Sequence, residues 1–405
     1  MSLTLEARRT SAPRGRAADA GPQLLAKVRE LAPALAARAG ELEEARRIPL
    51  DIVEQLRSIG LFRMYTPASH GGLELDFPTT LEVMTLLANA EGSIGWIAMI
   101  GAGSAPFFSR LPRQTYDEVY AHGPDVIVAG SAAPAGTAEQ VPGGWRVSGR
   151  WPFASGCQHA DQIFAGCLVT MDGKPAPGPV EGAPMIRHIV LPAAAWTIED
   201  TWRVAGLKGT GSCHISLKDV FVPDTNVMDF GGPSCLPGPL YAAPLQLVPL
   251  MHCGPAIGIA EGAIDDLVAL ASTGKRQLYS REPMRESQLF QAELGRIEAE
   301  VRAARAMVEA ETARQWGQTL AGALSPGNFS TSGIQTAVWV TQTCVRAADA
   351  CYALGGGSAL YDDSPLQRRM RDMHAAAQHA VVQPKNYVGA GAIRLGHPPR
   401  DPRLG

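Results

Sequence analysis

The stretch that decides the fold lies near the C-terminus and reads Arg371-Asp372-Met373-His374-Ala375-Ala376-Ala377-Gln378-His379-Ala380. It follows a glycine run at residues 354–358 and a basic pair at 368–369. The residue spacing predicts a helix from Pro365 to about Gln383. Within it, His379 carries an imidazole that titrates near neutrality, whereas Ala380 has no group that can act as a base.

The composition of the chain excludes several classes of protein. Its 405 residues can form two or three domains with a large core, and a net charge of −3 gives no argument for binding nucleic acid or a membrane surface. No apolar run approaches the roughly 20 residues of a membrane span. The seven cysteines lack the spacing of disulfides or metal ligands. We therefore expect a cytoplasmic protein without a metal site.

Three sections of different texture follow one another along the chain. We expect a disordered arm over residues 1–20 and an N-terminal helical domain over 21–126. Short β-type runs broken by glycine and proline predict a middle β domain over 127–235. Helical spacing then returns and predicts a C-terminal helical bundle domain over 236–405.

Three further motifs carry groups that suit a bound ligand. Residues 149–156 read Gly-Arg-Trp-Pro-Phe-Ala-Ser-Gly, an aromatic-rich run that leads to a hydroxyl. Residues 207–212 read Leu-Lys-Gly-Thr-Gly-Ser, in which glycines allow a ligand to approach the backbone closely. Arg276, with Gln288 beyond it, can bind a phosphate in bidentate fashion. No motif is the G-x-G-x-x-G fingerprint, so a nicotinamide-binding Rossmann domain is not expected.

In this order the four segments resemble those of the acyl-CoA dehydrogenase superfamily, over roughly residues 24–395. The resemblance implies a mostly α protein with a central β module. Its parts would be an N-terminal helical domain, a β-barrel-like middle domain and a C-terminal four-helix bundle. It also implies a homotetramer with the C-terminal helices at the interface.

The same resemblance implies a flavin site between the β module and the C-terminal helices. An isoalloxazine ring requires an apolar wall and a few directed hydrogen bonds. Two simpler interpretations stay open, because the 149–156 motif can be a strand end with core aromatics and Arg276 can belong to an exposed basic helix end. The implied cofactor-binding residues are Trp151, Phe153, Ala154, Ser155, Gly209, Thr210, Ser212, Arg276, Gln288 and Gly356.

The residue at the position of the catalytic base indicates the branch of the superfamily. Acyl-CoA dehydrogenases usually carry a glutamate where this chain has His379 and Ala380, and residues 240–258 contain no acid. Without a carboxylate, abstraction of an α-proton from a thioester has no evident agent. His379 and the turn Gly92-Ser93-Ile94-Gly95-Trp96 resemble instead the two-component (group D) flavin-dependent monooxygenases, such as the hydroxyphenylacetate and dibenzothiophene monooxygenases.

This branch implies hydroxylation of an aromatic or heteroaromatic substrate through a C4a-(hydro)peroxyflavin. Reduced FMN or FAD would come from a separate NAD(P)H:flavin reductase, and O₂ would be the second substrate. His379 would manage the distal oxygen and its proton, while Ser155 would order flavin N5. The residues implied for the substrate pocket are Trp96, Ser104, Phe107 and His374.

Several points about the substrate and the function stay open at this stage. Ser104 stands where phenol hydroxylases of this group often carry a histidine, so we expect a substrate other than a simple phenol. His374 can equally pack or contact a neighbouring subunit. A flavin dehydrogenase or oxidase with an unusual base would bleach its flavin with substrate and without a reductase. A non-enzymatic scaffold protein would retain no flavin.

Overall fold

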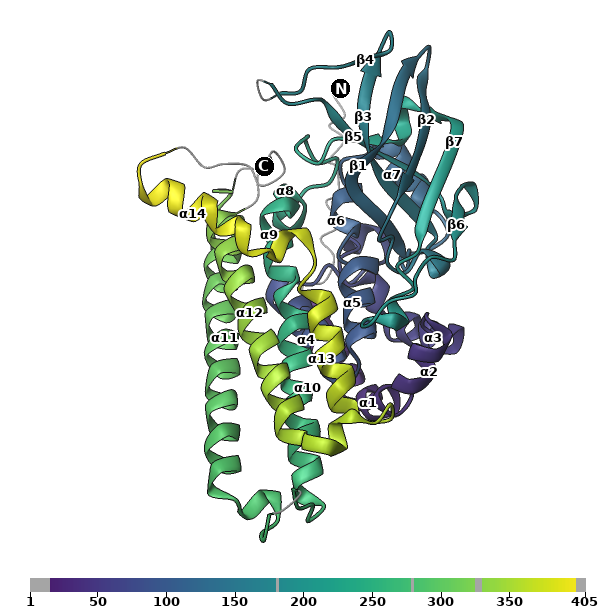
Figure 1. The fold of residues 1–405 in the computed structure, drawn as a ribbon. Helices are drawn as coiled ribbons and strands as arrows, with labels where there is room; N and C mark the ends of the chain where they lie inside the picture. Colours follow the sequence, from purple (N-terminus) through teal and green to yellow (C-terminus); the bar gives the residue numbers. More distant parts are fainter. Residues whose placement is uncertain (1–14, 180–181, 278–279, 325–329, 398–405) are drawn as a thin grey trace, which may run out of the picture.

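The structure is a computed structural model that describes residues 15–179, 182–277, 280–324 and 330–397. Helices occupy the chain up to Val119, strands follow from Val128 to Met228, and helices return from Pro239. Figure 1 shows the sheet at one end of the molecule, the long C-terminal helices to one side below it, and short N-terminal helices on the other side. The predicted architecture, mostly α with a central β module, is confirmed.

Two of the N-terminal helices, which start at Phe77 and Gly92, begin at a side-chain cap. Asp76 accepts a hydrogen bond from the N–H of Thr79, and Glu91 accepts one from the N–H of Ile94, so each carboxylate caps the helix that follows it. The first helix already begins at Gly15, so residues 15–20 are helical and not the expected arm; residues 1–14 lie outside the described residues. The helices are α1 (Gly15–Ala37), α2 (Ala39–Ala45), α3 (Leu50–Ile59), α4 (Phe77–Ala90), α5 (Gly92–Gly101), α6 (Ala105–Phe108) and α7 (Arg113–Val119).

The middle section is a mixed sheet in the order β6-β7-β2-β1-β3-β5-β8, with β4 paired to β3. Neighbouring strands are antiparallel except β1 and β3, which run parallel. The sheet has its own apolar core, separate from the core of the helices. The strands are β1 (Val128–Val141), β2 (Gly144–Trp151), β3 (Gln162–Met171), β4 (Lys174–Pro175), β5 (Ile186–Pro192), β6 (Thr197–Glu199), β7 (His214–Pro223) and β8 (Val227–Met228).

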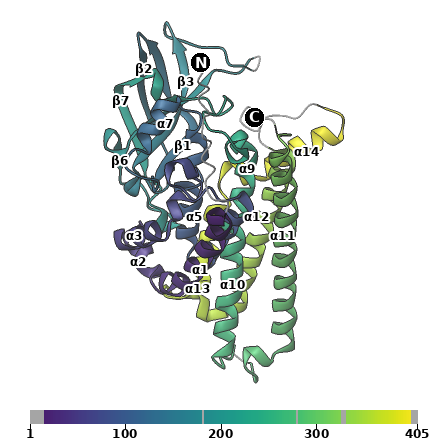
Figure 2. The same ribbon diagram turned by 180° about the vertical axis from the view of Figure 1, so that it is seen from behind.

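The C-terminal section is built around four long helices, α10 to α13, which pack along one another as Figure 2 shows from behind. One stretch, Pro244–Ser272, is long and apolar enough to cross a membrane, but 83% of its apolar window is buried inside the protein, as in a core helix. The helices are α8 (Pro239–Ala242), α9 (Pro244–Met251), α10 (Cys253–Ser272), α11 (Gln288–Leu320), α12 (Thr331–Gly355), α13 (Pro365–Ala376) and α14 (Tyr387–Arg394).

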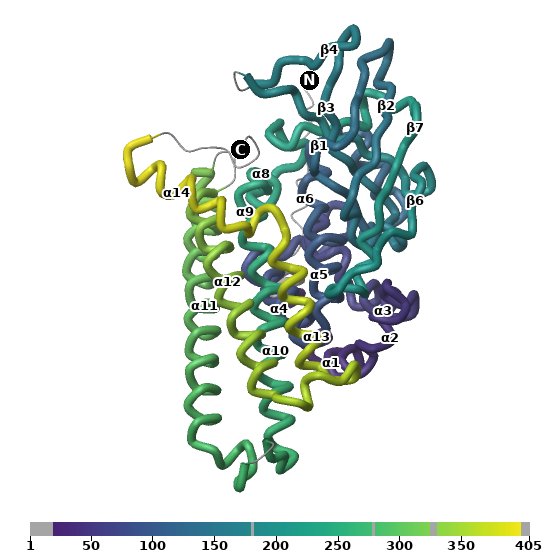
Figure 3. The backbone as a smooth tube through the Cα atoms, viewed as in Figure 1, coloured from purple at the N-terminus to yellow at the C-terminus, as the bar shows by residue number. Residues whose placement is uncertain are grey.

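The three sections meet around α5, which contacts α10, α13 and the 3₁₀ turn Lys208–Thr210 of the middle section. Figure 3 shows α5 and α13 close together below the sheet. Helix α13 ends at Ala376 and not near Gln383, because the following amides bond three residues back and the backbone of His379 is extended. His379 therefore lies in a turn that leaves the helix and points toward α5.

Candidate active site

Three aromatic rings from distant parts of the chain meet where the sections join. The ring centroids of His252 and His379 are 4.1 Å apart, and both rings lie edge-on to Trp96 at 5.8 Å and 6.0 Å. Trp96 comes from α5, His252 from the break between α9 and α10, and His379 from the turn after α13. Trp96 and His252 are buried, and His379 is partly buried.

A row of hydroxyl groups continues from Trp96 into the middle section. The indole N–H of Trp96 donates to Ser155 Oγ at 3.2 Å, and Ser155 Oγ lies 2.7 Å from Ser212 Oγ. Ser212 Oγ lies 2.7 Å from Thr210 Oγ1, which donates to the carbonyl of Leu207. The structure thus brings the two predicted motifs at 149–156 and 207–212 together with Trp96 and the predicted histidine.

The hydrogen bonds of the two histidines assign them opposite roles. Nδ1 of His252 lies 2.9 Å from the carbonyl of Val248, which has no proton to give, so Nδ1 carries the proton and Nε2 is bare. Nδ1 of His379 accepts the N–H of Val381, so in the neutral ring the proton of His379 sits on Nε2.

Both rings are neutral near physiological pH. Burial lowers the pKa of His252 to about 4. Burial, together with the neighbouring His252, lowers the pKa of His379 well below its ordinary value. The pair therefore presents one N–H donor and one nitrogen acceptor without a net charge.

His252 is the member of this site that sequence reasoning missed. It received no functional role, because an isolated histidine in an apolar stretch usually packs in the core. The available signal was its position as the first polar side chain after the run Leu247-Val248-Pro249-Leu250-Met251. That position in the sequence does not show which ring His252 faces. The pair of His252 and His379 is revealed only by the packing of α5 and of the turn after α13 against His252.

Phe153 offers an apolar surface beside the hydroxyl row. Its side chain is 66% exposed, and its backbone adopts φ of 65°, a conformation that residues with a side chain rarely take. Its ring lies edge-on to Trp202 at 6.4 Å. Backbone strain of this kind is retained mainly at functional sites, so this geometry suits the predicted flavin wall.

Two neighbours of Phe153 are packed in the protein. Trp151 is fully buried in the sheet core, where its indole N–H donates to the carbonyl of Gly166 and its ring packs edge-on against Trp196. Trp151 therefore does not face a ligand, contrary to the prediction, and matches the alternative of a core aromatic at a strand end. Ala154 is also buried, and its N–H is bonded to the carbonyl of Cys213.

Gly209 has a packing role in the turn that carries Thr210. A Cβ placed on it would lie 3.0 Å from the Cβ of Ser93 and 3.1 Å from the Cβ of Leu42. Glycine thus lets the turn approach α2 and α5 closely, and the same turn carries Thr210, which bonds to Ser212.

Three predicted cofactor residues lie far from the histidine pair. Arg276, Gln288 and Gly356 are exposed, at the end of α10, the start of α11 and the end of α12. Figure 1 shows these helix ends at the end of the bundle remote from the sheet. The loop after α10 does reach α12, because the side-chain amide of Gln277 donates to the carbonyl of Leu354. Within one chain these residues do not join the site, and Tyr279 lies outside the described residues.

The residues predicted for the substrate pocket divide in two. Ser104 and Phe107 are buried near α6, and the ring of Phe107 packs on Phe230 at 4.5 Å. His374 instead lies on the surface of α13, with its side chain 51% exposed and Nε2 2.8 Å from Asp349. Because α13 ends before His379, the two histidines face different surroundings, and His374 does not line this site.

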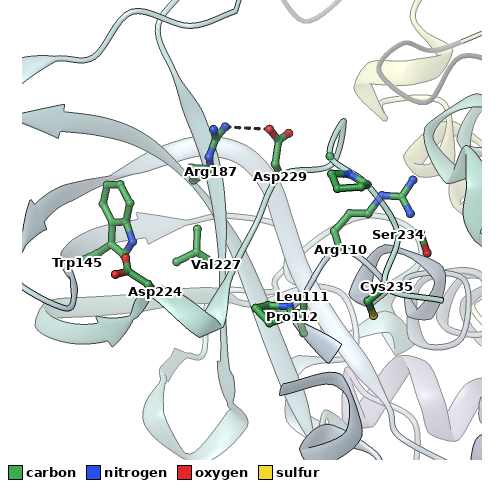
Figure 4. Close-up of a pocket in the computed structure, with 12 residues that line it drawn as sticks. Arg110, Leu111, Pro112, Trp145, Arg187, Asp224, Val227, Asp229, Ser234 and Cys235 are labelled. Carbon is green, nitrogen blue, oxygen red and sulfur yellow. Dashed lines mark ion pairs between the residues drawn. The ribbon is translucent and has the colours of Figure 1, made fainter. Parts of the chain in front are cut away.

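An open pocket of about 470 Å³ lies elsewhere, between α6 and the edge of the sheet. Figure 4 shows the ion pair of Arg187 and Asp229 at its rim and Trp145 across it. Arg110 contributes to this wall, but two of its guanidinium nitrogens are bonded to the carbonyls of Tyr241 and Ala242. The pocket contains no residue of the histidine pair or the hydroxyl row.

Known proteins are similar in sequence to this chain over most of its length. Residues 21–108 match the acyl-CoA dehydrogenase N-terminal domain, and residues 250–384 match the acyl-CoA dehydrogenase C-terminal domain. The chain is 31% identical to an indole-3-acetate monooxygenase of Pseudomonas putida, across 90% of this chain and 91% of that protein. It is 30% identical to HsaA of Rhodococcus jostii, the oxygenase subunit of a flavin-dependent monooxygenase, across 92% of this chain and 98% of that protein.

A solved structure extends the similarity to three dimensions. XiaF from Streptomyces sp., in complex with FADH2 and glycerol, has a TM-score of 0.83 and 26% identity, and the match covers 95% of this chain and 98% of XiaF. These similarities define a flavoprotein of the oxygenase type. The chain belongs to the flavin-dependent monooxygenases of the acyl-CoA dehydrogenase superfamily.

Proposed function

We propose that this protein uses a reduced flavin and O₂ to hydroxylate an aromatic or heteroaromatic substrate beside the histidine pair. The observation that carries the proposal is the chemistry of the site. The neutral imidazole of His379, with its proton on Nε2, lies where the three sections meet. In the described part of the chain, no carboxylate is hydrogen-bonded to the side chains of this site, which are Trp96, Ser155, His252 and His379. A site without a carboxylate suits oxygenation better than removal of an α-proton.

The residues fit a flavin at the hydroxyl row. A bound reduced flavin supplies the two electrons that activate O₂. Phe153 offers the apolar surface for one ring face, and Ser155 offers its hydroxyl to the ring edge, held in place by Ser212 and by the N–H of Trp96. His379 holds a proton at Nε2 where oxygen would react. The buried rings exclude water, which limits unproductive loss of reduced oxygen.

The relatives named above support the further parts of the proposal. HsaA is named as an oxygenase subunit, which supports a separate NAD(P)H:flavin reductase as the source of reduced flavin. The complex of XiaF with FADH2 favours FAD over FMN as the cofactor. Exposed Arg276, Gln288 and Gly356 would bind the distal part of FAD from a neighbouring subunit of a homotetramer. We place this enzyme in the cytoplasm, free of nucleic acid and membrane, in line with its composition.

The test is a stopped-flow experiment with anaerobic protein loaded with reduced FAD, and separately with reduced FMN, mixed with oxygenated buffer. The expected result is a long-lived absorbance that differs from both reduced and oxidised flavin, followed by a hydroxylated product when an aromatic substrate is present. Direct reoxidation, together with bleaching of the oxidised flavin by an acyl thioester and no reductase, would overturn the proposal in favour of a dehydrogenase.

A further inference from the structure

The bare nitrogen of His252 is the least explained buried group in the site. The side chain is 6% exposed, and Nε2 has no hydrogen-bond partner and no accessible surface. Leaving a buried acceptor unpaired is unfavourable, so such groups usually have a water or ligand partner. The bond from Nδ1 to the carbonyl of Val248 accounts for one ring nitrogen, but no contact accounts for Nε2.

The position of this nitrogen is fixed by the backbone. The backbone N–H of His252 bonds to Leu250 at the end of α9, and the side chain Nδ1–H donates to the carbonyl of Val248. That second bond holds the ring in one orientation and keeps the proton on Nδ1. Nε2 therefore carries no proton and can only accept a hydrogen bond from a ligand.

The surroundings of His252 suit a flat aromatic molecule. Trp96 and His379 present rings to it from two other elements, at 5.8 Å and 4.1 Å. Aromatic pairs favour such edge and offset contacts, so a group that takes the place of one of these rings beside His252 would best be aromatic. The hydroxyls of Ser155 and Ser212 are already paired with each other, and the Trp96 N–H is paired with Ser155. Among these side chains, His252 is the one whose acceptor nitrogen has no partner, and a substrate would reach it by displacing one of the rings that cover it.

We infer that Nε2 of His252 binds the substrate by accepting a hydrogen bond from an N–H or O–H group carried on its aromatic ring. This inference rests on the proposed function and deepens it, because it names a specificity-determining residue and a substrate class. Polarising a ring N–H or O–H raises the electron density of the ring, which favours transfer of oxygen to ring carbon. Ser104, which is the weaker acceptor and lies near α6, is not needed for this role.

The test compares paired probes that differ only in the donor. Indole and 1-methylindole, and phenol and anisole, are titrated into flavin-free protein by isothermal calorimetry, which does not require turnover. In the wild-type protein the N–H or O–H member should bind about tenfold more tightly than its methylated partner, the worth of one good hydrogen bond. His252→Phe keeps a ring without an acceptor and should bring that ratio to about one. His252→Gln, which retains an acceptor oxygen, should restore part of it.

Equal binding of both members of each pair by the wild-type protein, an unchanged ratio in His252→Phe, or no binding of any probe would overturn the inference. Circular dichroism and binding of reduced FAD serve as controls that the variants are folded. A second measurement needs no ligand: ¹⁵N NMR of the histidine rings should show Nδ1 of His252 protonated and Nε2 bare, and the reverse would also overturn the inference. A lost oxygen transient with an intact probe ratio would refute only the proposed function.

Discussion

Replacing Ser212 with alanine should both destabilise the protein and weaken its hold on reduced flavin. Ser212 is 2% exposed and stands at the centre of the hydroxyl row, 2.7 Å from Ser155 and 2.7 Å from Thr210. Two hydrogen bonds are lost at a net value of about 0.5–1.5 kcal/mol each. Thr210 keeps its bond to the carbonyl of Leu207 and Ser155 keeps its bond from the Trp96 N–H, so each remaining hydroxyl still has one partner. The expected cost is therefore about 1–3 kcal/mol.

The functional part of the prediction is separate from stability. Without Ser212 the hydroxyl of Ser155 is held only by the Trp96 N–H, so its hydrogen bond to the flavin edge should weaken, and the Kd for reduced FAD should rise about five- to tenfold. Urea denaturation measures the first effect, and anaerobic titration with reduced FAD measures the second.

A matched control is available at another buried serine. Ser109 donates to the carbonyl of Pro106 and accepts from Arg110, away from the hydroxyl row. Ser109→Ala should lose a similar free energy of unfolding, about 1–3 kcal/mol, and leave the Kd for FAD unchanged. Equal weakening of FAD binding by both variants, or no weakening by Ser212→Ala, would refute the assigned role of the hydroxyl row.

The remaining predictions concern the histidine and the contacts that join the sections. His379→Ala should reduce hydroxylated product about a hundredfold or more while changing reduced-flavin affinity little; equal loss of both would assign His379 to cofactor binding instead. Burial raises the pKa of Glu91 and of Asp372, so the folded protein holds protons that the unfolded chain releases. This contribution to stability is complete below the unfolded carboxyl pKa of about 4 and is lost as pH rises through the raised folded values. Denaturation curves should therefore show a smaller loss of stability from about pH 5 to about pH 8 in Glu91→Gln than in the wild type, and parallel curves would contradict it. Gly206→Ala should lower the free energy of unfolding by about 1–3 kcal/mol, because the new Cβ would lie 2.0 Å from the carbonyl oxygen of Arg371, a backbone atom that cannot rotate away. Calorimetric melting would detect the change as a lower Tm, and an unchanged Tm would argue against that contact.

Local sequence determined the architecture and named several of the residues that the structure brings together. Apolar residues recur with different periods in helices and in strands, so the order of helices, sheet and helices can be predicted without a structure. The absence of an acid from residues 240–258 and the pair His379-Ala380 are facts of sequence, and they indicated the monooxygenase branch. Ser155 and Ser212 were also named from the sequence, because each lies beside a glycine in a segment that resembles a flavin-binding segment of the superfamily.

Only the tertiary structure decided which side chains meet. Trp151 and Phe153 are two residues apart, yet the last residue of β2 points into the sheet core while the positive φ of Phe153 turns its ring to the surface. The early end of α13 directs His379 toward His252 and leaves His374 with Asp349 on the surface. The partner of His252 comes from a segment more than a hundred residues away in sequence. A single sequence records periodicity along the chain but not which distant rings share a buried space, so the histidine pair emerged only from the packing of three separate elements.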